Sequence, residues 1–175
     1  MTVQTKTKLK RYAVYGVVIL LAHILQNILT IFPQIASVRP VLLISVVICI
    51  SMFEGEVVGA VVGLLSGALW DTLTVTADGY NAVYLMIACA VCGMLLRIFM
   101  RNNIITYIMM NTGTTMLYFL TYVLFFITAR GIDGGAELLL RYYLPMSIYS
   151  LALTPAIYWL IRGINRKFSY DYTEY

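Results

Sequence analysis

The sequence predicts an all-α fold, a polytopic transmembrane helical bundle of about six helices. Of the 175 residues, 61% are hydrophobic and 11% are charged, whereas about a quarter of the residues in a soluble globular domain are charged. The apolar residues fall into helix-length segments bounded by charged residues, Gly and Pro. These segments cover residues 12–32, 41–53, 57–74, 80–100, 104–129 and 140–161. We therefore expect residues 1–175 to form a single integral membrane domain, with short tails at 1–11 and 162–175.

The basic residues predict the orientation of this bundle. If all six segments cross, both chain ends lie on one side, where nine Lys and Arg residues stand against three opposite. The nine are Lys6, Lys8, Lys10, Arg11, Arg97, Arg101, Arg162, Arg166 and Lys167, and the three are Arg39, Arg130 and Arg141. Because basic residues accumulate on the cytoplasmic side, both termini are predicted to be cytoplasmic. Segment 41–53 is short for a span and could be tilted, thin or re-entrant. If segment 41–53 did not cross the membrane, Arg97 and Arg101 would lie outside together with the C-terminal basic residues. The distribution of basic residues therefore favours six crossings over five.

Three polar side chains share one face of the first segment. His23, Gln26 and Asn27 are three or four residues apart, so they lie on the same side of a helix. In lipid, such side chains turn inward and hydrogen-bond a neighbouring helix. His23 could instead belong to a proton relay, but no carboxylate accompanies it in this segment, which favours the structural role.

The third segment has a small residue at every fourth position. Gly55, Gly59, Gly63 and Gly67 precede Asp71 at the same spacing. In a bilayer, glycines at this spacing form a groove that lets another helix backbone approach closely. Positions four apart advance about 400° around a helix, so the groove winds. We expect it to serve one contact within the fold and one with a partner; packing within the fold alone is the alternative.

The glycine ladder ends in an acid. A carboxylate in mid-membrane costs about 2.5–3.5 kcal/mol on insertion scales. Asp71 is therefore predicted to lie near the outer interface, to face protein or to line a wet cavity. There it would hold the outer helix ends together, or meet the partner, through charge-assisted hydrogen bonds.

The remaining polar residues of the apolar segments are interpreted as packing residues. Cys89 and Cys92 share a helix face, but two thiols without His or acid partners make a poor zinc site. Together with Cys49 they are expected to pack as small apolar residues. Asn111 begins the polar run NTGTT in the fifth segment, where it is expected to contact another helix, with a pocket wall as the alternative.

The motifs that catalysis needs are missing from the sequence. It contains no phosphate-binding loop, no HExxH, no Ser/His/Asp arrangement in the right context and no cluster of metal ligands. With a single His and one predicted membrane acid, we expect a protein that is not an enzyme and that has neither a cofactor nor a metal. The net charge of +4 reflects the membrane orientation and carries no nucleic-acid signal.

Four motifs mark turns and helix ends within residues 39–95. In chain order they are Arg39-Pro40, Gly55-Glu56, the glycine ladder ending in Asp71, and Gly79-Tyr80-Asn81-Ala82. Each is weak alone, but in this order they resemble the MreD family of bacterial rod shape-determining proteins. The resemblance covers about a third of the chain, and the first, fifth and sixth segments carry no diagnostic motif.

The resemblance implies a non-enzymatic scaffold of the elongation (rod) complex in the bacterial cytoplasmic (inner) membrane. Such a protein would bind the single-span protein MreC, and through it connect with MreB, RodA and a class B penicillin-binding transpeptidase. It would thereby help to organise peptidoglycan synthesis and cell shape. The resemblance also implies a six-helix fold similar to the substrate-binding subunits of energy-coupling-factor transporters, with an outward-facing cavity near Asp71.

That similarity supplies the alternative function, a vitamin- or metal-binding subunit of an energy-coupling-factor transporter. Such subunits often carry an Ala-xxx-Ala pair on the first helix, whereas Ala13 and Ala22 are nine residues apart here. A third interpretation, a carrier of lipid-linked precursors or a flippase accessory, needs outer basic groups to meet a pyrophosphate. Only Arg39, Arg130 and Arg141 could serve there.

Overall fold

The computed structural model describes residues 3–27, 40–73, 79–99, 102–128 and 139–170, and these residues form helices joined by turns, with no strand among them. In chain order the helices are α1 (Val3–Asn27), α2 (Leu42–Glu54), α3 (Glu56–Asp71), α4 (Tyr80–Ile98), α5 (Ile104–Phe126), the short π-helical segment η2 (Leu139–Tyr143) and α7 (Leu144–Tyr170). The prediction of an all-α fold with about six helices is therefore confirmed.

Two helices extend into the predicted tails. α1 begins at Val3 rather than near residue 12, and α7 continues to Tyr170 rather than ending near residue 161. The Lys and Arg residues of both extensions are good helix formers, so each helix continues past its apolar segment. The described parts of the predicted tails are thus helical continuations of the bundle.

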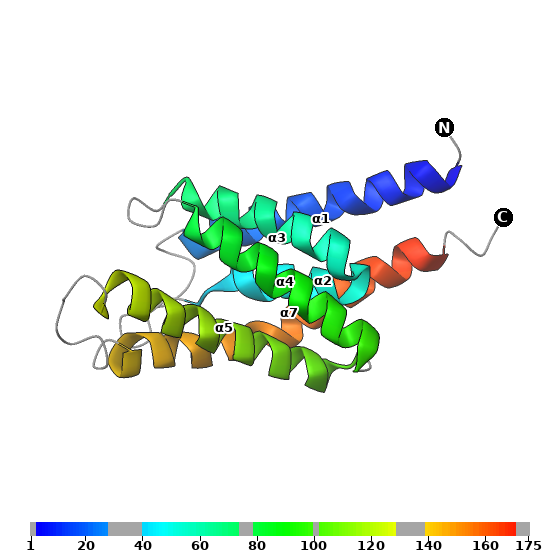
Figure 1. The fold of residues 1–175 in the computed structure, drawn as a ribbon. Coiled ribbons are helices and arrows are strands. Elements are labelled where there is room, and N and C mark those ends of the chain that lie inside the picture. The colour runs from blue at the N-terminus through cyan, green and yellow to red at the C-terminus, as the bar shows by residue number, and fades with distance from the viewer. Residues whose placement is uncertain (1–2, 28–39, 74–78, 100–101, 129–138, 171–175) are drawn as a thin grey trace.

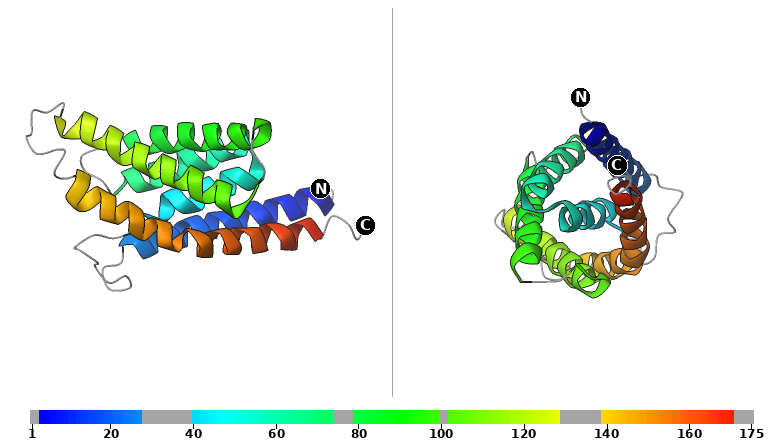
Figure 2. Two further views of the ribbon diagram at one scale, coloured as in Figure 1. Left: turned by 90° about the horizontal axis from the view of Figure 1, so that it is seen from below. Right: turned by 90° about the vertical axis from the view of Figure 1, so that its right-hand side faces the viewer.

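The short helix α2 occupies the middle of the bundle. Viewed along the helices, α1, α3, α4, α5 and α7 form a ring around it (Figure 2, right). Every residue of α2 from Leu42 to Met52 is buried. The sequence LLISVVICISM is apolar or small on all sides, and a helix of this composition is stable only where protein or lipid surrounds it completely. This position explains why α2 lacks the polar face of a surface helix.

Hydrogen bonds tie α2 to three of the surrounding helices. Ser51 Oγ donates to the Cys89 carbonyl of α4 at 2.5 Å, and Tyr107 of α5 donates to the Ser45 carbonyl at 2.7 Å. The backbone N–H of Val41, just before α2, donates to Ser150 Oγ of α7 at 2.8 Å. Buried polar groups are costly unless they are paired, so these bonds fix how the ring packs on α2.

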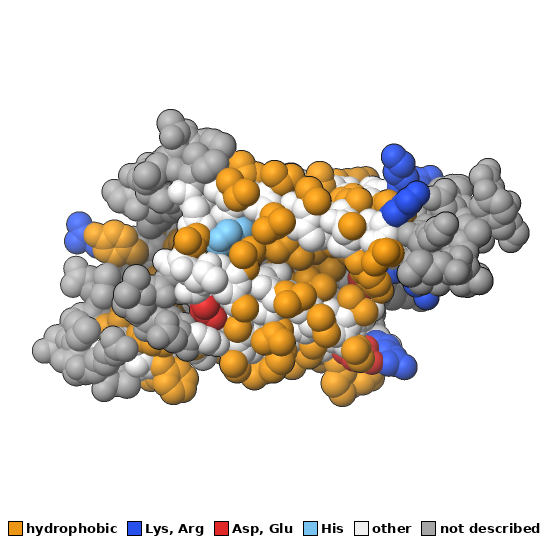
Figure 3. All heavy atoms as spheres, turned by 90° about the horizontal axis from the view of Figure 1, so that it is seen from above, with side chains coloured by type: hydrophobic (Ala, Val, Ile, Leu, Met, Phe, Trp, Pro, Cys, Tyr) orange, Lys and Arg blue, Asp and Glu red, His pale blue; other side chains and the backbone are white. Residues whose placement is uncertain are grey.

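In the part of the chain that the structure describes, four stretches of helix are long and apolar enough to cross a membrane: Lys8–Asn27, Tyr80–Ile98, Ile104–Phe126 and Arg141–Phe168. Apolar side chains cover much of the flank of the bundle, and Lys and Arg side chains gather mainly at one end (Figure 3). At this end α1 begins and α7 finishes (Figure 1). The chain is therefore a membrane protein whose two terminal helices start and finish at the same end of the bundle.

Candidate functional site

The glycine ladder of α3 packs against the backbone of α4. A Cβ added at Gly63 would overlap the Leu85 carbonyl, and one added at Gly67 would overlap the backbone of Asn81 and Ala82. A Cβ at Gly59 would overlap Ser51 of α2. The prediction of a close-approach surface is confirmed. The expectation that these three glycines also receive a partner helix is wrong, because α2 and α4 of the same chain already fill the space.

Gly55 is a turn residue and not a part of this surface. Its φ of 89° lies in the left-handed region, which glycine adopts readily, and it joins α2 to α3 in a single residue. Gly93 of α4 packs on this corner: an added Cβ would lie 2.7 Å from the Glu56 N atom and 2.8 Å from the Gly55 carbonyl carbon. Sequence reasoning missed Gly93, although Cys89 and Gly93 repeat the four-residue spacing on α4.

Asp71 caps the start of α4 from the end of α3. Its carboxylate accepts hydrogen bonds from the backbone N–H groups of Asn81 at 3.2 Å and Ala82 at 3.0 Å. A negative charge is favourable at a helix N-terminus, where the N–H groups have no partner within the helix. The expectation that Asp71 holds helix ends together is confirmed for α3 and α4.

Gly79 and Asn81 lie at the same junction, where the end of α3 meets the start of α4. Gly79 precedes α4 with a φ of 79°, a second position that favours glycine. The buried Asn81 accepts a hydrogen bond through Oδ1 from the Tyr118 hydroxyl of α5 at 2.6 Å. Aromatic rings pack beside it, with Trp70 stacked on Tyr118 and Tyr80 tilted against it. An aromatic cluster therefore packs beside the junction at which Asp71 caps α4.

We expect Asp71→Asn to lower the free energy of unfolding by about 1 kcal/mol, the usual contribution of a cap. An amide offers a single oxygen, so one of the two N–H groups loses its acceptor, and the charge at the N-terminus of α4 is lost. Thermal unfolding in detergent would measure the change. Thr72→Val is the matched control, because it removes an exposed hydroxyl whose one hydrogen bond among the described residues is to the Leu69 carbonyl of α3. Equal stability of the two variants would contradict the capping role.

Of His23, Gln26 and Asn27, Gln26 is the one that bonds to a neighbouring helix among the described residues. Gln26 Oε1 accepts a hydrogen bond from the Leu43 N–H at the start of α2, at 3.2 Å. His23 is buried, and its Nδ1 has no hydrogen-bond partner among the described residues. Asn27 is exposed and donates to the His23 carbonyl of its own helix. The prediction of an interhelical bond is therefore confirmed for Gln26 and wrong for Asn27.

Asn111 and the cysteines also lie where packing residues are expected. Asn111 is buried and donates from Nδ2 to Thr154 Oγ1 of α7 at 3.0 Å, so it joins α5 to α7. Cys49, Cys89 and Cys92 are buried free thiols. Within the described ranges, no group of three His, Cys, Asp or Glu side chains could hold a metal ion.

The other family-motif positions lie near the loops. Pro40 is buried just ahead of α2, whereas Arg39, Arg101 and Arg130 are outside the described residues. Glu56 forms an exposed ion pair with Arg97 of α4. The pKa of Glu56, which precedes the apolar part of α3, lies below its usual value because its carboxylate accepts a hydrogen bond from its own backbone N–H and pairs with Arg97.

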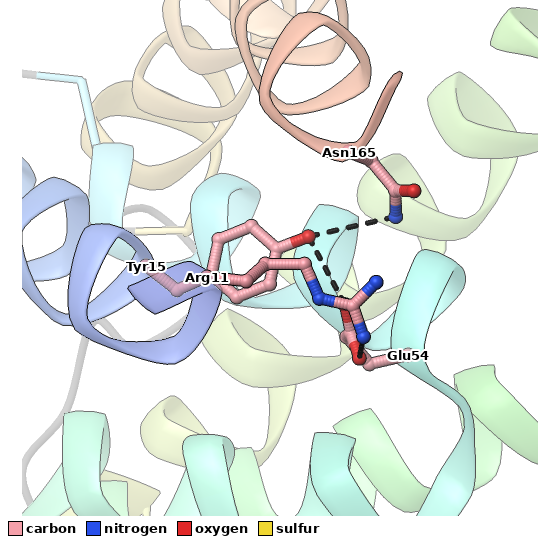
Figure 4. A network of polar contacts seen from close by, with 4 residues as sticks. All are labelled: Arg11, Tyr15, Glu54 and Asn165. Carbon is pink, nitrogen blue, oxygen red and sulfur yellow. Dashed lines mark hydrogen bonds and ion pairs between the residues drawn. The ribbon is translucent and has the colours of Figure 1, made fainter. Parts of the chain in front are cut away.

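A second acid, Glu54, forms a buried ion pair that sequence reasoning missed. Glu54 Oε2 lies 2.7 Å from Arg11 Nη2, and the two side chains are 4% and 16% exposed. The Tyr15 hydroxyl donates to Glu54 Oε1 at 3.1 Å and accepts from Asn165 Nδ2 at 3.5 Å (Figure 4). The network joins α1, α2 and α7 at the end where α1 begins. Arg11 and Glu54 are 43 residues apart, so no local pattern predicts their contact.

An apolar groove of about 520 Å³ runs between α1 and α3 on the flank of the bundle. Its walls are residues of α1 between Tyr12 and Leu20 and residues of α3 between Val57 and Leu69. At 1.5 Å per residue, the α3 wall is about 18 Å long. α1 and α3 both pack on α2, but neither packs extensively on the other. We call this surface the α1–α3 groove.

A family model described as rod shape-determining protein MreD matches residues 8–168. The match extends the resemblance seen in residues 39–95 to nearly the whole chain, including α1, α5 and α7, which carry no diagnostic motif. No curated protein and no solved structure matches the chain. The likeness to substrate-binding subunits of energy-coupling-factor transporters therefore stays a prediction.

Proposed function

The chain belongs to the MreD family of rod shape-determining proteins, and on this premise we propose that it is a non-enzymatic scaffold of the elongation (rod) complex in the bacterial inner membrane. Its direct partner is an MreC-like single-span protein. Through this partner it connects with MreB, RodA and a class B penicillin-binding transpeptidase, and so helps to organise peptidoglycan synthesis.

The observation that carries this proposal is the position of α2. A transporter subunit that binds a vitamin needs room for its ligand inside the bundle, whereas here a fully buried helix occupies the middle. Interior amides also serve packing: Asn111 bonds to α7 and Asn81 to α5. A bundle filled in this way acts through its outer surface, which favours a scaffold over the transporter alternative.

The proposed orientation places both termini in the cytoplasm, with several crossings between them. The start of α1 and the end of α7 lie at the same end of the bundle, and the described Lys8, Lys10, Arg162, Arg166 and Lys167 belong to these two helix ends. Basic residues favour the cytoplasmic side of a membrane protein. The charge distribution therefore supports this orientation.

Copurification from native membranes tests the proposal. We expect the tagged, full-length chain, extracted in mild detergent, to retain an MreC-like protein with one transmembrane segment, identified by mass spectrometry. We also expect cells that lack the chain to lose their rod shape and to recover it when the chain is supplied. A purified chain that holds a vitamin tightly, with no wall-synthesis protein attached, would contradict the scaffold and favour the transporter subunit.

A further inference from the structure

We propose that the start of α1 and the end of α7 together bind the headgroups of anionic phospholipids. This inference goes beyond the proposed scaffold function and does not depend on the identity of the protein partner. We call the surface the basic end of the bundle. It is defined by five exposed residues of these two helices: Lys8, Lys10, Arg162, Arg166 and Lys167.

The positive charge of the basic end exceeds the negative charge near it in the sequence. Residues 1–11 and 162–175 together contain seven Lys and Arg residues and two acidic residues. The acidic residues of the described ranges are Glu54, Glu56 and Asp71, and they have partners of their own. Glu54 pairs with Arg11, Glu56 pairs with Arg97, and Asp71 caps α4. The excess of positive charge at the basic end therefore attracts anions from the surroundings.

The length of α7 places its basic residues at the level of the lipid headgroups. The stretch Arg141–Phe168 has 28 residues, which is about 42 Å of helix, whereas the hydrocarbon core of a bilayer is about 30 Å thick. Trp159 is 64% exposed, and such aromatic side chains favour the boundary between hydrocarbon and headgroups. Arg162 and Arg166 follow Trp159 by three and seven residues, so all three share one face of α7.

Aromatic rings position the Arg162 side chain at this level. Its guanidinium carbon lies 5.7 Å from the centre of the Trp159 ring and 5.8 Å from the centre of the Tyr158 ring. Both distances are within the range of cation–π attraction. An arginine can also offer two parallel N–H groups to one phosphate. We therefore expect Arg162 to contribute most to headgroup binding.

Hydrogen bonds hold α1 beside α7 at the basic end. The Tyr15 hydroxyl of α1 accepts from Asn165 Nδ2 of α7 at 3.5 Å and donates to Glu54 of α2 (Figure 4). Lys8 and Lys10 lie within two helical turns of Tyr15. The basic residues of both helices thus belong to one surface. Basic surfaces between transmembrane helices are typical binding places for anionic headgroups.

A phospholipid fits this surface better than a soluble anion or an acidic protein does. On the face that carries Arg162 and Arg166, the exposed Trp159 indole lies on the side toward the hydrocarbon, and the neighbouring Leu160 is 53% exposed. A phospholipid offers a phosphate and acyl chains in the same order along the membrane normal, so it can contact the arginines and the apolar side chains at once. A soluble anion offers the charge alone.

The fluorescence of Trp159 tests the proposal. The chain has two Trp residues, so Trp159 is the sole Trp in the variant Trp70→Phe. The full-length variant is placed in vesicles of phosphatidylcholine and phosphatidylglycerol, with one of the two lipids carrying brominated acyl chains that quench tryptophan on contact. The quenching gives the binding constant of the anionic lipid relative to the zwitterionic lipid. We expect a ratio of about five or more that falls as salt is added.

Two substitutions of one charge each locate the preference. In the Trp70→Phe background, Arg162→Gln should lower the ratio by about fivefold, because a basic residue near the membrane surface contributes a factor of about this size. Arg97→Gln is the matched control. It also removes one exposed positive charge, but this charge is already paired with Glu56, so the ratio should stay unchanged.

Three results would overturn the assignment. Equal binding of the two lipids would exclude a lipid site and favour an acidic protein as the occupant of the basic end. An equal loss in Arg162→Gln and Arg97→Gln would show a general effect of net charge. Inorganic phosphate that abolishes the preference, where chloride of the same ionic strength does not, would assign the site to a soluble anion. None of these results bears on the scaffold function, which copurification tests separately.

Discussion

Gly63→Ala is expected to destabilise the folded protein by about 3 kcal/mol, near the upper end of the usual range for overpacking. The new methyl group would overlap the Leu85 carbonyl oxygen and carbon of α4. These are backbone atoms, which cannot move aside as a flexible side chain can. The two helices would have to separate along their length, and the bonds from Asp71 to the start of α4 would weaken with them.

The buried thiols provide the measurement. Cys49, Cys89 and Cys92 are 0%, 0% and 3% exposed, so a thiol-reactive fluorogenic reagent labels them only when the bundle opens. We expect Gly63→Ala to be labelled at a clearly lower temperature than the wild-type chain in the same detergent. The control is Gly113→Ala, whose methyl group meets no atom within 4 Å.

Gly113→Ala should leave the labelling temperature unchanged or raise it, because alanine favours a helix over glycine by up to about 1 kcal/mol. If both alanine variants behave alike, the close packing of α3 on α4 does not determine stability. In that case the glycine ladder would have to serve a purpose other than the stability of the folded bundle.

Removal of the Glu54 carboxylate is expected to have an effect of similar size or larger. Glu54→Ala leaves the Arg11 guanidinium, which is only 16% exposed, without its anion. Loss of one partner of a buried ion pair costs about 3–5 kcal/mol. The Tyr15 hydroxyl also loses its acceptor, so the contact of α1 with α2 and α7 weakens. Thiol labelling of Cys49 in α2 would report the loss as a lower unfolding temperature.

Two comparisons separate this effect from a general effect of charge. Glu56→Ala breaks the exposed pair with Arg97, whose side chain is 73% exposed, and should lower the stability far less, because ion pairs in contact with solvent contribute little. The double variant Arg11→Met, Glu54→Leu removes both charges and should recover much of the stability, because apolar residues of similar volume can replace a buried pair. A stable Glu54→Ala protein, or a double variant as unstable as the single one, would contradict this account.

Helix positions could be predicted from the sequence because apolar runs of helix length are local signals. The glycine ladder likewise identified a surface for close approach. Its spacing, however, defines a face of α3 and not the helix that covers it. That choice depends on the turn between α3 and α4, where Asp71 and Gly79 bring the two helices back together.

Other features depend on contacts that no local pattern contains. Gln26 and Asn27 are neighbours in sequence, so their side chains differ by about 100° in direction around α1; only Gln26 can point at α2. The Arg11–Glu54 pair joins separate helices. The α1–α3 groove exists because two helices pack on α2 without packing extensively on each other, and a sequence does not display the absence of a contact.

The central position of α2 has a consequence for biogenesis. The ribosome completes α2 early, yet its hydrogen-bonding groups meet Cys89, Tyr107 and Ser150, which are synthesised later. Until α7 is made, the Val41 N–H just before α2 therefore lacks its acceptor, Ser150 Oγ, and one side of α2 lacks its covering helix. The enclosure of α2 is thus completed by α7, which follows every other described helix in the chain.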